Sequence, residues 1–204
     1  VFDGEAPELK RQTWENRTEA KQQAKEKYEK AIEEEDIEAM GKYAKGFSKI
    51  DDEMIKESKE LLEAMGIAVF QALSEGEIQA AELVKGGEAY AVGSQDYDAL
   101  VVGSARLIQN LTLARKRKTV SGFIYIAPEV IEYEKVLNHL GIDGDQFISL
   151  AILVGTDFNP GGVKGIGPKK ALALVKQKKY PVAIFEEVVE RHGDLGFDWK
   201  DVFE

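Results

Sequence analysis

The sequence predicts an α/β fold with a largely parallel sheet, and two observations support it. Short apolar segments of strand-like composition alternate with amphipathic segments of helical period between residues 51 and 157. Acidic residues directly follow several of the apolar segments, as is typical of open sheets whose ligands bind beyond the carboxyl ends of the strands. A chain of 204 residues can build one sizeable core, so we expect one domain with an insertion.

The first elements are a strand end and a long polar segment. Val1–Gly4 is typical of the end of a strand. Residues 8–45 are mainly charged or small helix formers, with a thin apolar line at Ala24, Tyr28 and Ile32. Because a helix that is polar on most sides adds little to a core, composition alone favours a solvated arm or linker.

The regular α/β elements follow this arm. Helical periodicity, bounded by glycine or by Pro128, predicts helices over residues 51–65, 75–85, 129–140 and 143–154. Apolar runs predict strands over residues 67–73, 89–93, 106–112 and 123–126, the first of them buried.

Composition excludes several functional classes. The absence of cysteine excludes disulfides, thiol catalysis and cysteine-ligated zinc, and two scattered histidines are too few for a histidine metal site. No apolar run approaches the roughly 18 residues of a membrane span, and no secretory signal is recognisable, so we expect a cytoplasmic protein without a membrane partner.

The net charge of −10 argues against a nucleic-acid partner only if its distribution is ignored. Six lysines and no acid lie between Phe158 and Phe185, and Arg115–Lys118 forms a second basic block. The acids gather in Glu33–Asp36 and in separate short motifs. Such segregated charge is compatible with DNA binding.

Carboxylates form the first candidate site. Those that follow predicted strands or helices are Asp3, Glu75, Glu77, Asp96, Asp98 and Asp157. Because parallel strands end at one edge of a sheet, we expect them to converge there. Clustered carboxylates repel one another, and some would take up protons unless cations compensate. Oxygen ligands without His or Cys select Mg²⁺ or Mn²⁺. Two such ions about 3.5–4 Å apart can activate a water and stabilise the leaving oxygen when a phosphodiester is hydrolysed.

Each acid also has a structural alternative. Ser74–Glu77 fits a capping box, Asp96 and Asp98 fit turn positions, and Asp3 and Asp157 fit a turn and a loop. These alternatives leave unexplained why the acidic pairs follow successive strands.

A basic glycine loop over residues 161–171 is the second candidate site. Gly167 and Pro168 suit a helix start, and glycines before a helix leave backbone N–H groups free to meet a phosphate. The lysines would supply positive charge and the glycines backbone N–H groups. These candidate DNA-binding residues are Lys164, Gly165, Gly167, Lys169 and Lys170. The alternative is a tight helix–helix turn with solvated lysines, whereas a Walker loop is excluded by the missing Gly-Lys-Ser/Thr.

Five segments in order carry a family resemblance: VFDG, SEGEIQAA, SQDYDAL, RLIQNLT and AILVGTDFNPGGVKGIGPKKAL. They resemble archaeal and eukaryotic flap endonucleases of the structure-specific 5′-nuclease superfamily, over essentially the whole chain. The resemblance implies a PIN-like nuclease core, a helical arch and a helix-two-turn-helix DNA-binding element. It divides one nuclease domain, residues 1–204, into an arch over 8–50, a core with the metal site over 51–157 and the DNA-binding region over 158–204.

The resemblance also assigns roles by residue. The two-metal site would hold Mg²⁺, with Mn²⁺ as a substitute, on Asp3, Glu75, Glu77, Asp96, Asp98 and Asp157. Lys10 and Arg17 match a basic pair that contacts the scissile phosphate, and a spacing of seven places them on one helical face. The arm becomes an arch that admits a single strand, and the hairpin from Gly165 to Lys170 grips duplex DNA, with a K⁺ ion on its carbonyls.

Departures from the family bear on activity. We expect the chain to begin and end inside a longer enzyme, after an N-terminal segment of roughly 80 residues that supplies one further metal-binding Asp. The sliding clamp would be bound through a tail absent here. Glu5-Ala6, Gly93, Val101 and Ser149 replace the family's usual residues, the last of them an Asp.

The predicted function is structure-specific cleavage of 5′ flaps in replication and repair by a monomeric Mg²⁺-dependent endonuclease and 5′–3′ exonuclease. Branched DNA is its partner, in the cytoplasm beside the nucleoid for an archaeal source and in the nucleus for a eukaryotic one. The alternatives are a fragment that binds branched DNA without cutting it, another 5′-nuclease, and a PIN-type ribonuclease.

Overall fold

A computed structural model describes residues 1–47, 50–112, 115–119 and 122–203. The chain forms two compact units, one of Val1–Ala6 with Gln71–Glu204 and the other of Pro7–Phe70. The second unit thus contains the predicted arch together with the helix that follows it. Among the described residues, every helix is too short or too polar to cross a lipid bilayer.

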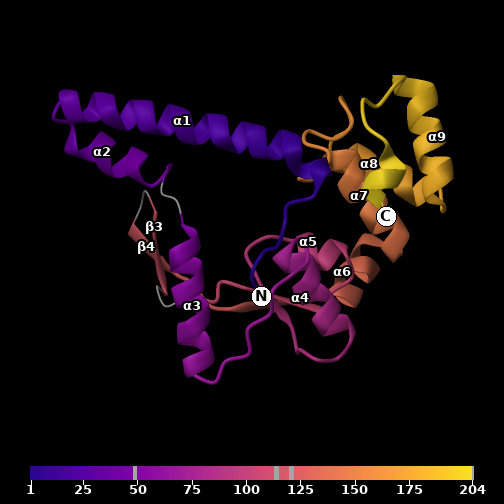
Figure 1. Ribbon diagram of the computed structural model, residues 1–204. Helices are drawn as coiled ribbons and strands as arrows, with labels where there is room; N and C mark the ends of the chain where they lie inside the picture. Colours follow the sequence, from indigo (N-terminus) through magenta and orange to yellow (C-terminus); the bar gives the residue numbers. More distant parts are fainter. Residues whose placement is uncertain (48–49, 113–114, 120–121, 204) are drawn as a thin grey trace. The chain divides into compact units, whose positions relative to one another are not determined.

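The elements described in the Pro7–Phe70 unit are all helices. Its elements are η1 (Glu8–Lys10), α1 (Arg11–Glu33), α2 (Ile37–Ala44) and α3 (Asp52–Ala64). The chain reverses between α1 and α2 at Glu35, which has a positive φ of 55°, and the two helices lie side by side (Figure 1). Asp36 caps α2 by accepting a hydrogen bond from Ala39 N, and Tyr28 of α1 packs against Phe47 at 5.1 Å between ring centroids. The polar arm is therefore a helical hairpin.

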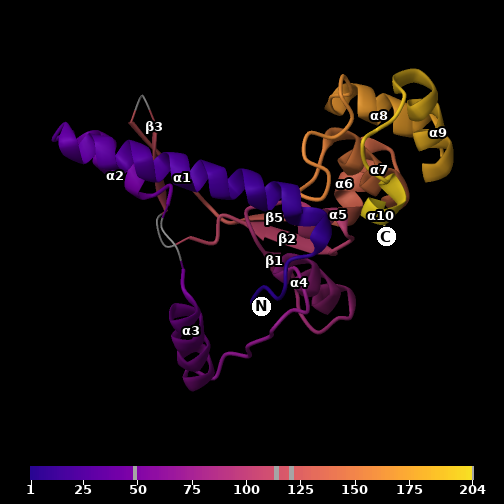
Figure 2. The ribbon, with the colours of Figure 1, turned by 45° about the horizontal axis from the view of Figure 1, so that its top comes forward.

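The other unit contains a three-stranded sheet of order β1 (Val92–Gly93), β2 (Arg106–Gln109) and β5 (Glu129–Glu132), visible in Figure 2. β1 and β2 are parallel, whereas β2 and β5 are antiparallel. The α/β class is confirmed, but the sheet is mixed rather than largely parallel. The prediction of a helix starting at residue 129 was wrong, because residues 129–132 pair with β2 and α6 (Tyr133–Leu140) begins only after them.

One further strand prediction was wrong, and another is confirmed as a strand but in a separate sheet. The segment 67–73 is not a buried strand: a single parallel bridge joins Gln71 to Phe2, and Leu73 is 92% exposed. The segment near 123–126 does form β4 (Gly122–Tyr125), but β4 pairs with β3 (Lys116–Thr119) as a separate exposed hairpin. Most of the basic block Arg115–Lys118 lies on β3, and Lys116 Nζ lies 5.1 Å from the centroid of the Tyr125 ring. The side chain of Lys118 is not among those that the structure describes.

Two apolar clusters hold this unit together. One joins the sheet to α4 (Gly76–Lys85) and α5 (Asp98–Val101) through Ala81, Val92, Ala99, Leu100 and Leu107. The other lies among α7 (Gly144–Val154), α8 (Pro168–Gln177), α9 (Pro181–His192) and α10 (Trp199–Phe203). Asp143 and Gln146 form a capping box that starts α7.

Candidate active site and nucleic-acid interface

Asp3 is held at the start of α4. Ala72 N donates to Phe2 O at 2.9 Å and Gly4 N donates to Ser74 O at 2.6 Å, so the N-terminal residues run beside the segment that leads into α4. The Asp3 carboxylate then accepts a hydrogen bond from Gly76 N at 2.8 Å. A carboxylate at a helix N-terminus is favoured by the helix dipole as well as by this bond.

Gly4 and Gly76 permit this close approach. A Cβ atom on Gly4 would lie 2.5 Å from the backbone of Leu73, and one on Gly76 would lie 2.7 Å from Asp3 Oδ1. Real Cβ contacts are not this short, so a side chain on Gly4 would push the N-terminal residues away from the segment before α4, and one on Gly76 would displace the Asp3 carboxylate. The two glycines therefore set the position of Asp3.

Glu75 and Glu77 come from the first turn of α4. Glu75 is the N-cap residue and makes no side-chain capping bond, so the capping box with Ser74 as its cap is absent. Glu77 is half-buried, its Oε1 accepts a short hydrogen bond from Ser94 Oγ, and its Oε2 is shielded from solvent. Glu77 is thus fixed by a residue that follows β1.

The loop after β1 carries Asp96 and Asp98. Asp96 N donates to Ser94 Oγ at 3.1 Å, and Asp98 is the first residue of α5. Gln109, buried at the end of β2, braces the loop by donating through Nε2 to Gln95 O at 2.8 Å. Both aspartates are exposed.

Asp157 belongs to a separate loop after α7. The loop is built around Asn159, which is 4% exposed and donates to Ile152 O at 2.7 Å. The Asn159 amide oxygen accepts hydrogen bonds from the backbone N–H and the hydroxyl of Thr156. This loop fixes the backbone on both sides of Asp157.

The structure therefore links Asp3 to the start of α4, and Glu77 through Ser94 to the Asp96 loop. No group of three or more His, Cys, Asp or Glu side chains among the described residues is arranged to hold a metal ion. The donor chemistry nevertheless fits a hard divalent ion, since every candidate ligand is a carboxylate. Mg²⁺ commonly binds one or two carboxylates together with water and substrate phosphate, so these pairs suit it without a closed protein cage.

Lys10 and Arg17 lie in the helical unit. Lys10 closes η1 immediately before α1, and Arg17 follows within α1, about two turns later. Lys10 is buried and is the N-cap residue of α1, with a non-helical ψ of 1°, so the pair does not lie in one continuous α-helix as the spacing of seven assumed. Their contact with a phosphate stays a prediction.

The glycine loop joins α7 to α8 as a tight hairpin. Gly155, Gly161, Gly162 and Gly165 all have positive φ values. A Cβ on Gly162 would lie 2.5 Å from Leu153 O, and Val163 N donates to that same oxygen at 2.9 Å. The loop backbone is therefore folded directly onto the end of α7, which only glycine permits.

The residues predicted to contact DNA lie in the second half of this hairpin and at the start of α8. Gly167 is the N-cap of α8, with Pro168 at the first helical position and no side-chain capping bond. Lys164, Lys169 and Lys170 are exposed, and Lys170 Nζ donates to Gly165 O at 3.0 Å. An uncapped helix start flanked by lysines suits a phosphate of a nucleic-acid backbone.

Sequence reasoning missed three polar residues that organise the site. Ser94 joins Glu77 to the Asp96 loop, Gln109 braces that loop, and Gln71 Nε2 donates to Asp3 O at 2.7 Å. Gln109 had a usable signal, because it occupies an inward position of β2 where the strand alternation calls for an apolar residue. Ser94 and Gln71 had none, since their contacts depend on tertiary placement.

Comparison with known proteins adds an independent line of support. The profile of the XPG I-region matches residues 66–157. Flap endonuclease 1 of Staphylothermus marinus is 52% identical over 181 residues, which are 88% of this chain and 52% of that protein. Flap endonuclease 1 of Pyrococcus furiosus is 49% identical over 189 residues, 92% of this chain and 56% of that protein. The chain thus spans about half the length of the curated relatives it matches.

Two solved structures share the fold. Flap endonuclease-1 from Methanococcus jannaschii aligns with a TM-score of 0.66 and 41% identity, covering 100% of this chain and 59% of that one. The catalytic core of Rad2 in complex with DNA substrate aligns with a TM-score of 0.60 and 26% identity, covering 100% of this chain and 56% of that one. These alignments confirm the fold class of a PIN-like nuclease core.

Proposed function

From the premise that this chain is a homologue of the flap endonucleases and carries an XPG I-region, we propose that it cleaves DNA at the base of a 5′ flap. The reaction is hydrolysis of a phosphodiester by water, which leaves a 3′ hydroxyl and a 5′ phosphate. The protein acts as a monomer on branched DNA, in the compartment that contains the chromosome.

One observation carries the proposal: side chains from distant parts of the sequence place acids around the start of α4. Asp3 contacts Gly76 N, and Ser94 bridges Glu77 to the backbone of Asp96. Asp98 follows at the start of α5. The Asp3–Gly76 and Ser94–Glu77 bonds join residues 73 and 17 positions apart, which a local turn does not need and which suits metal ligands held in place by hydrogen bonds.

The acids would hold two Mg²⁺ ions, for which Mn²⁺ can substitute, on Asp3, Glu75, Glu77, Asp96, Asp98 and Asp157. When bound, such ions activate a water and stabilise the leaving oxygen. The chain's own contribution is to fix the carboxylates before the substrate arrives, through the bonds to Ser94, Gln109 and Gly76. Lys10 and Arg17 supply positive charge to the scissile phosphate.

The α7–α8 hairpin would hold duplex DNA. Its exposed lysines and uncapped helix start contact phosphates without reading bases. A K⁺ ion would bind hairpin carbonyls other than Gly165 O, because the Lys170 ammonium already contacts that oxygen.

The test is incision of end-labelled DNA by this chain in Mg²⁺. We expect a 5′-flap substrate to be cut near its junction, a linear duplex of the same sequence to be cut far more slowly, and EDTA to abolish both reactions. Equal cutting of the two substrates would contradict branch recognition, and cutting that survives EDTA would contradict the metal mechanism.

A second candidate function is binding of branched DNA without cleavage. It is favoured by the α7–α8 hairpin, whose exposed lysines and uncapped helix start can contact DNA without any metal ion. Retained binding of the flap substrate without incision in Mg²⁺ or Mn²⁺ would establish this second function and exclude the first.

A further inference from the structure

We propose that Trp14 is a stacking platform for an unpaired base of single-stranded DNA, on a cationic face of α1. The inference rests on the proposed function, because it names the contact that the helical arm would make with the flap strand. It concerns a residue outside the carboxylate site and outside the α7–α8 hairpin.

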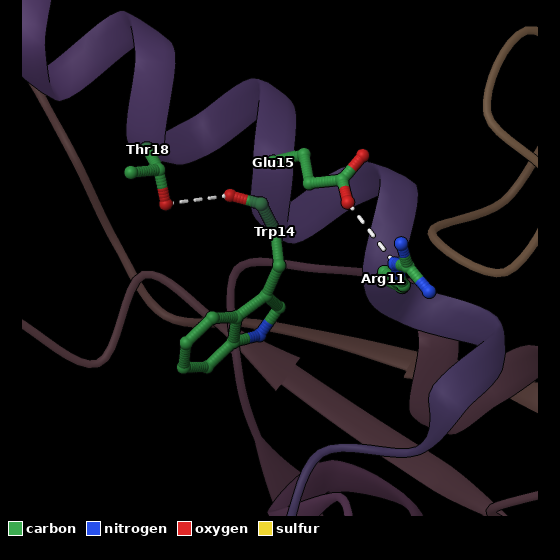
Figure 3. Close-up of polar contacts among 4 residues, drawn as sticks. All are labelled: Arg11, Trp14, Glu15 and Thr18. Atoms are coloured by element: carbon green, nitrogen blue, oxygen red, sulfur yellow. Dashed lines mark hydrogen bonds and ion pairs between the residues drawn. The ribbon is translucent and has the colours of Figure 1, made fainter.

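Trp14 presents its indole to solvent. The residue is 60% exposed, and Figure 3 shows the indole standing off α1 while the Thr18 hydroxyl donates to the Trp14 carbonyl at 2.8 Å. The other tryptophan, Trp199, is stacked on Phe185 with 4.4 Å between ring centroids. Trp14 is therefore the tryptophan whose ring surface is open to a ligand.

Positive side chains share the face of α1 that carries Trp14. Lys21 and Lys25 follow it by seven and eleven residues, which places them within about 20° of Trp14 around the helix axis. Arg11 and Arg17 lie within about 60° on either side. Lys21 and Lys25 are exposed. Arg11 forms an ion pair with Glu15, with 3.0 Å between Nε and Oε1 (Figure 3).

The acids of α1 lie mainly on another face. Glu15, Glu19, Glu26 and Glu33 fall about 100–140° from Trp14, and Glu29, at about 60°, lies four turns farther along. A shallow hollow beside the indole is lined by Thr18, by the paired Arg11 and Glu15, and by Glu19, which has no basic neighbour in that lining. Phosphates would be repelled there, so a bound strand would run along the lysines and turn a base toward the ring.

This combination is the chemistry of single-strand recognition. Lysines along one line track the phosphates without regard to sequence, and an aromatic ring stacks on an unpaired base because every base has a π face. A base inside a duplex offers no such face from the side, so the occupant is single-stranded rather than double-stranded DNA.

Tryptophan fluorescence of the whole chain tests the contact, because only Trp14 and Trp199 emit. We expect oligo(dT) to quench the emission of the wild-type protein, and the Trp14→Phe variant to bind it with little quenching. The Trp14→Ala variant should bind about tenfold more weakly, with part of the affinity retained in Trp14→Phe. Unchanged affinity in Trp14→Ala would overturn the inference, as would equal quenching by a blunt duplex.

A pair of charge variants tests the face. Lys21→Gln/Lys25→Gln and Lys27→Gln/Lys30→Gln remove the same charge from the same helix, but the second pair lies about 140–160° away from Trp14. The first pair should weaken oligo(dT) binding about tenfold and flatten its salt dependence by about 1.4 in log–log slope. Equal losses in both pairs would show diffuse attraction and overturn the assignment.

Failure here is separable from failure of the proposed function. If the wild-type protein cuts flaps while Trp14→Ala binds oligo(dT) normally, the stacking platform is wrong and the nuclease stands. If oligo(dT) quenches Trp14 but no flap is cut in any metal, the platform stands and the nuclease is wrong.

Discussion

Replacing Ser94 with alanine removes one hydroxyl that serves two acidic residues. Ser94 Oγ donates to Glu77 Oε1 and accepts from Asp96 N at 3.1 Å. The backbone of Ser94 is held independently, because its N–H donates to Ile108 O at 3.2 Å. The substitution should therefore leave the strand in place and release Glu77 and the Asp96 loop.

The expected magnitude follows from the two lost bonds. A hydrogen bond to a charged group contributes about 1.5–3 kcal/mol and a neutral one about 0.5–1.5 kcal/mol, although relaxation recovers part of this for the partly exposed loop. We expect unfolding free energy to fall by about 1–2 kcal/mol. A partner that orients metal ligands typically affects metal affinity by about 10–100-fold, so the Mg²⁺ concentration for half-maximal incision should rise at least about tenfold.

The assay is the rate of flap incision as a function of Mg²⁺, beside thermal unfolding with and without Mg²⁺. Ser94→Thr keeps the hydroxyl and should restore most of the Mg²⁺ dependence. If Ser94→Ala has the wild-type Mg²⁺ requirement, Ser94 does not position Glu77 and the Asp96 loop. A Ser94→Thr variant that is as defective as Ser94→Ala would refute the same role.

Three further predictions concern other parts of the chain. Gly162→Ala should lower the unfolding free energy by about 3 kcal/mol or more, because the new Cβ would meet the α7 backbone. Gly161→Ala, also at a positive φ but beside open space, should lower it by only about 1 kcal/mol. Chemical denaturation measures both variants, and equal losses would contradict the close approach of Gly162 to α7. Lys170→Gln should weaken duplex binding and lower the salt-dependence slope by about 0.9, measured by fluorescence anisotropy; an unchanged slope would remove Lys170 from the interface. Burial, reinforced by nearby acids, raises the pKa of the Tyr133 phenol above 10.0, so the neutral form is favoured in the folded state. The contribution of the neutral phenol to stability is complete below its ordinary pKa and is lost as pH rises through the raised pKa. Between about pH 9 and 12, the unfolding free energy of Tyr133→Phe should therefore fall less with rising pH than that of the wild type.

The fold class followed from the sequence, while several elements did not. The acidic motifs after Leu73 and Gly93 and the glycine loop before α8 were local signals, and the structure gives each a defined place. Residues 129–132 were misassigned because Pro128 and the residues after it fit a helix start, while pairing with β2 makes them a strand. Leu73 was misassigned because an apolar residue can remain exposed before a helix.

The candidate site was predictable in its acids but not in their support. Glu77 and Asp96 were identified by their positions after predicted strands, of which the one before Glu77 is only a single bridge. The hydroxyl that joins them belongs to Ser94, a residue with no distinguishing local pattern. Trp14 was not singled out from the sequence, because the exposure of its ring is a property of the folded helix.

The most direct test of the central claim, that these acids hold the ions on which cutting depends, is calorimetric titration of the chain with Mn²⁺. We predict saturable binding that Asp96→Asn/Asp98→Asn weakens at least about tenfold, as loss of metal ligands requires. The control Glu186→Gln/Glu190→Gln removes the same charge from the exposed face of α9 and should bind Mn²⁺ like the wild type. Equal Mn²⁺ binding by all three proteins, or none by the wild type, would contradict the account.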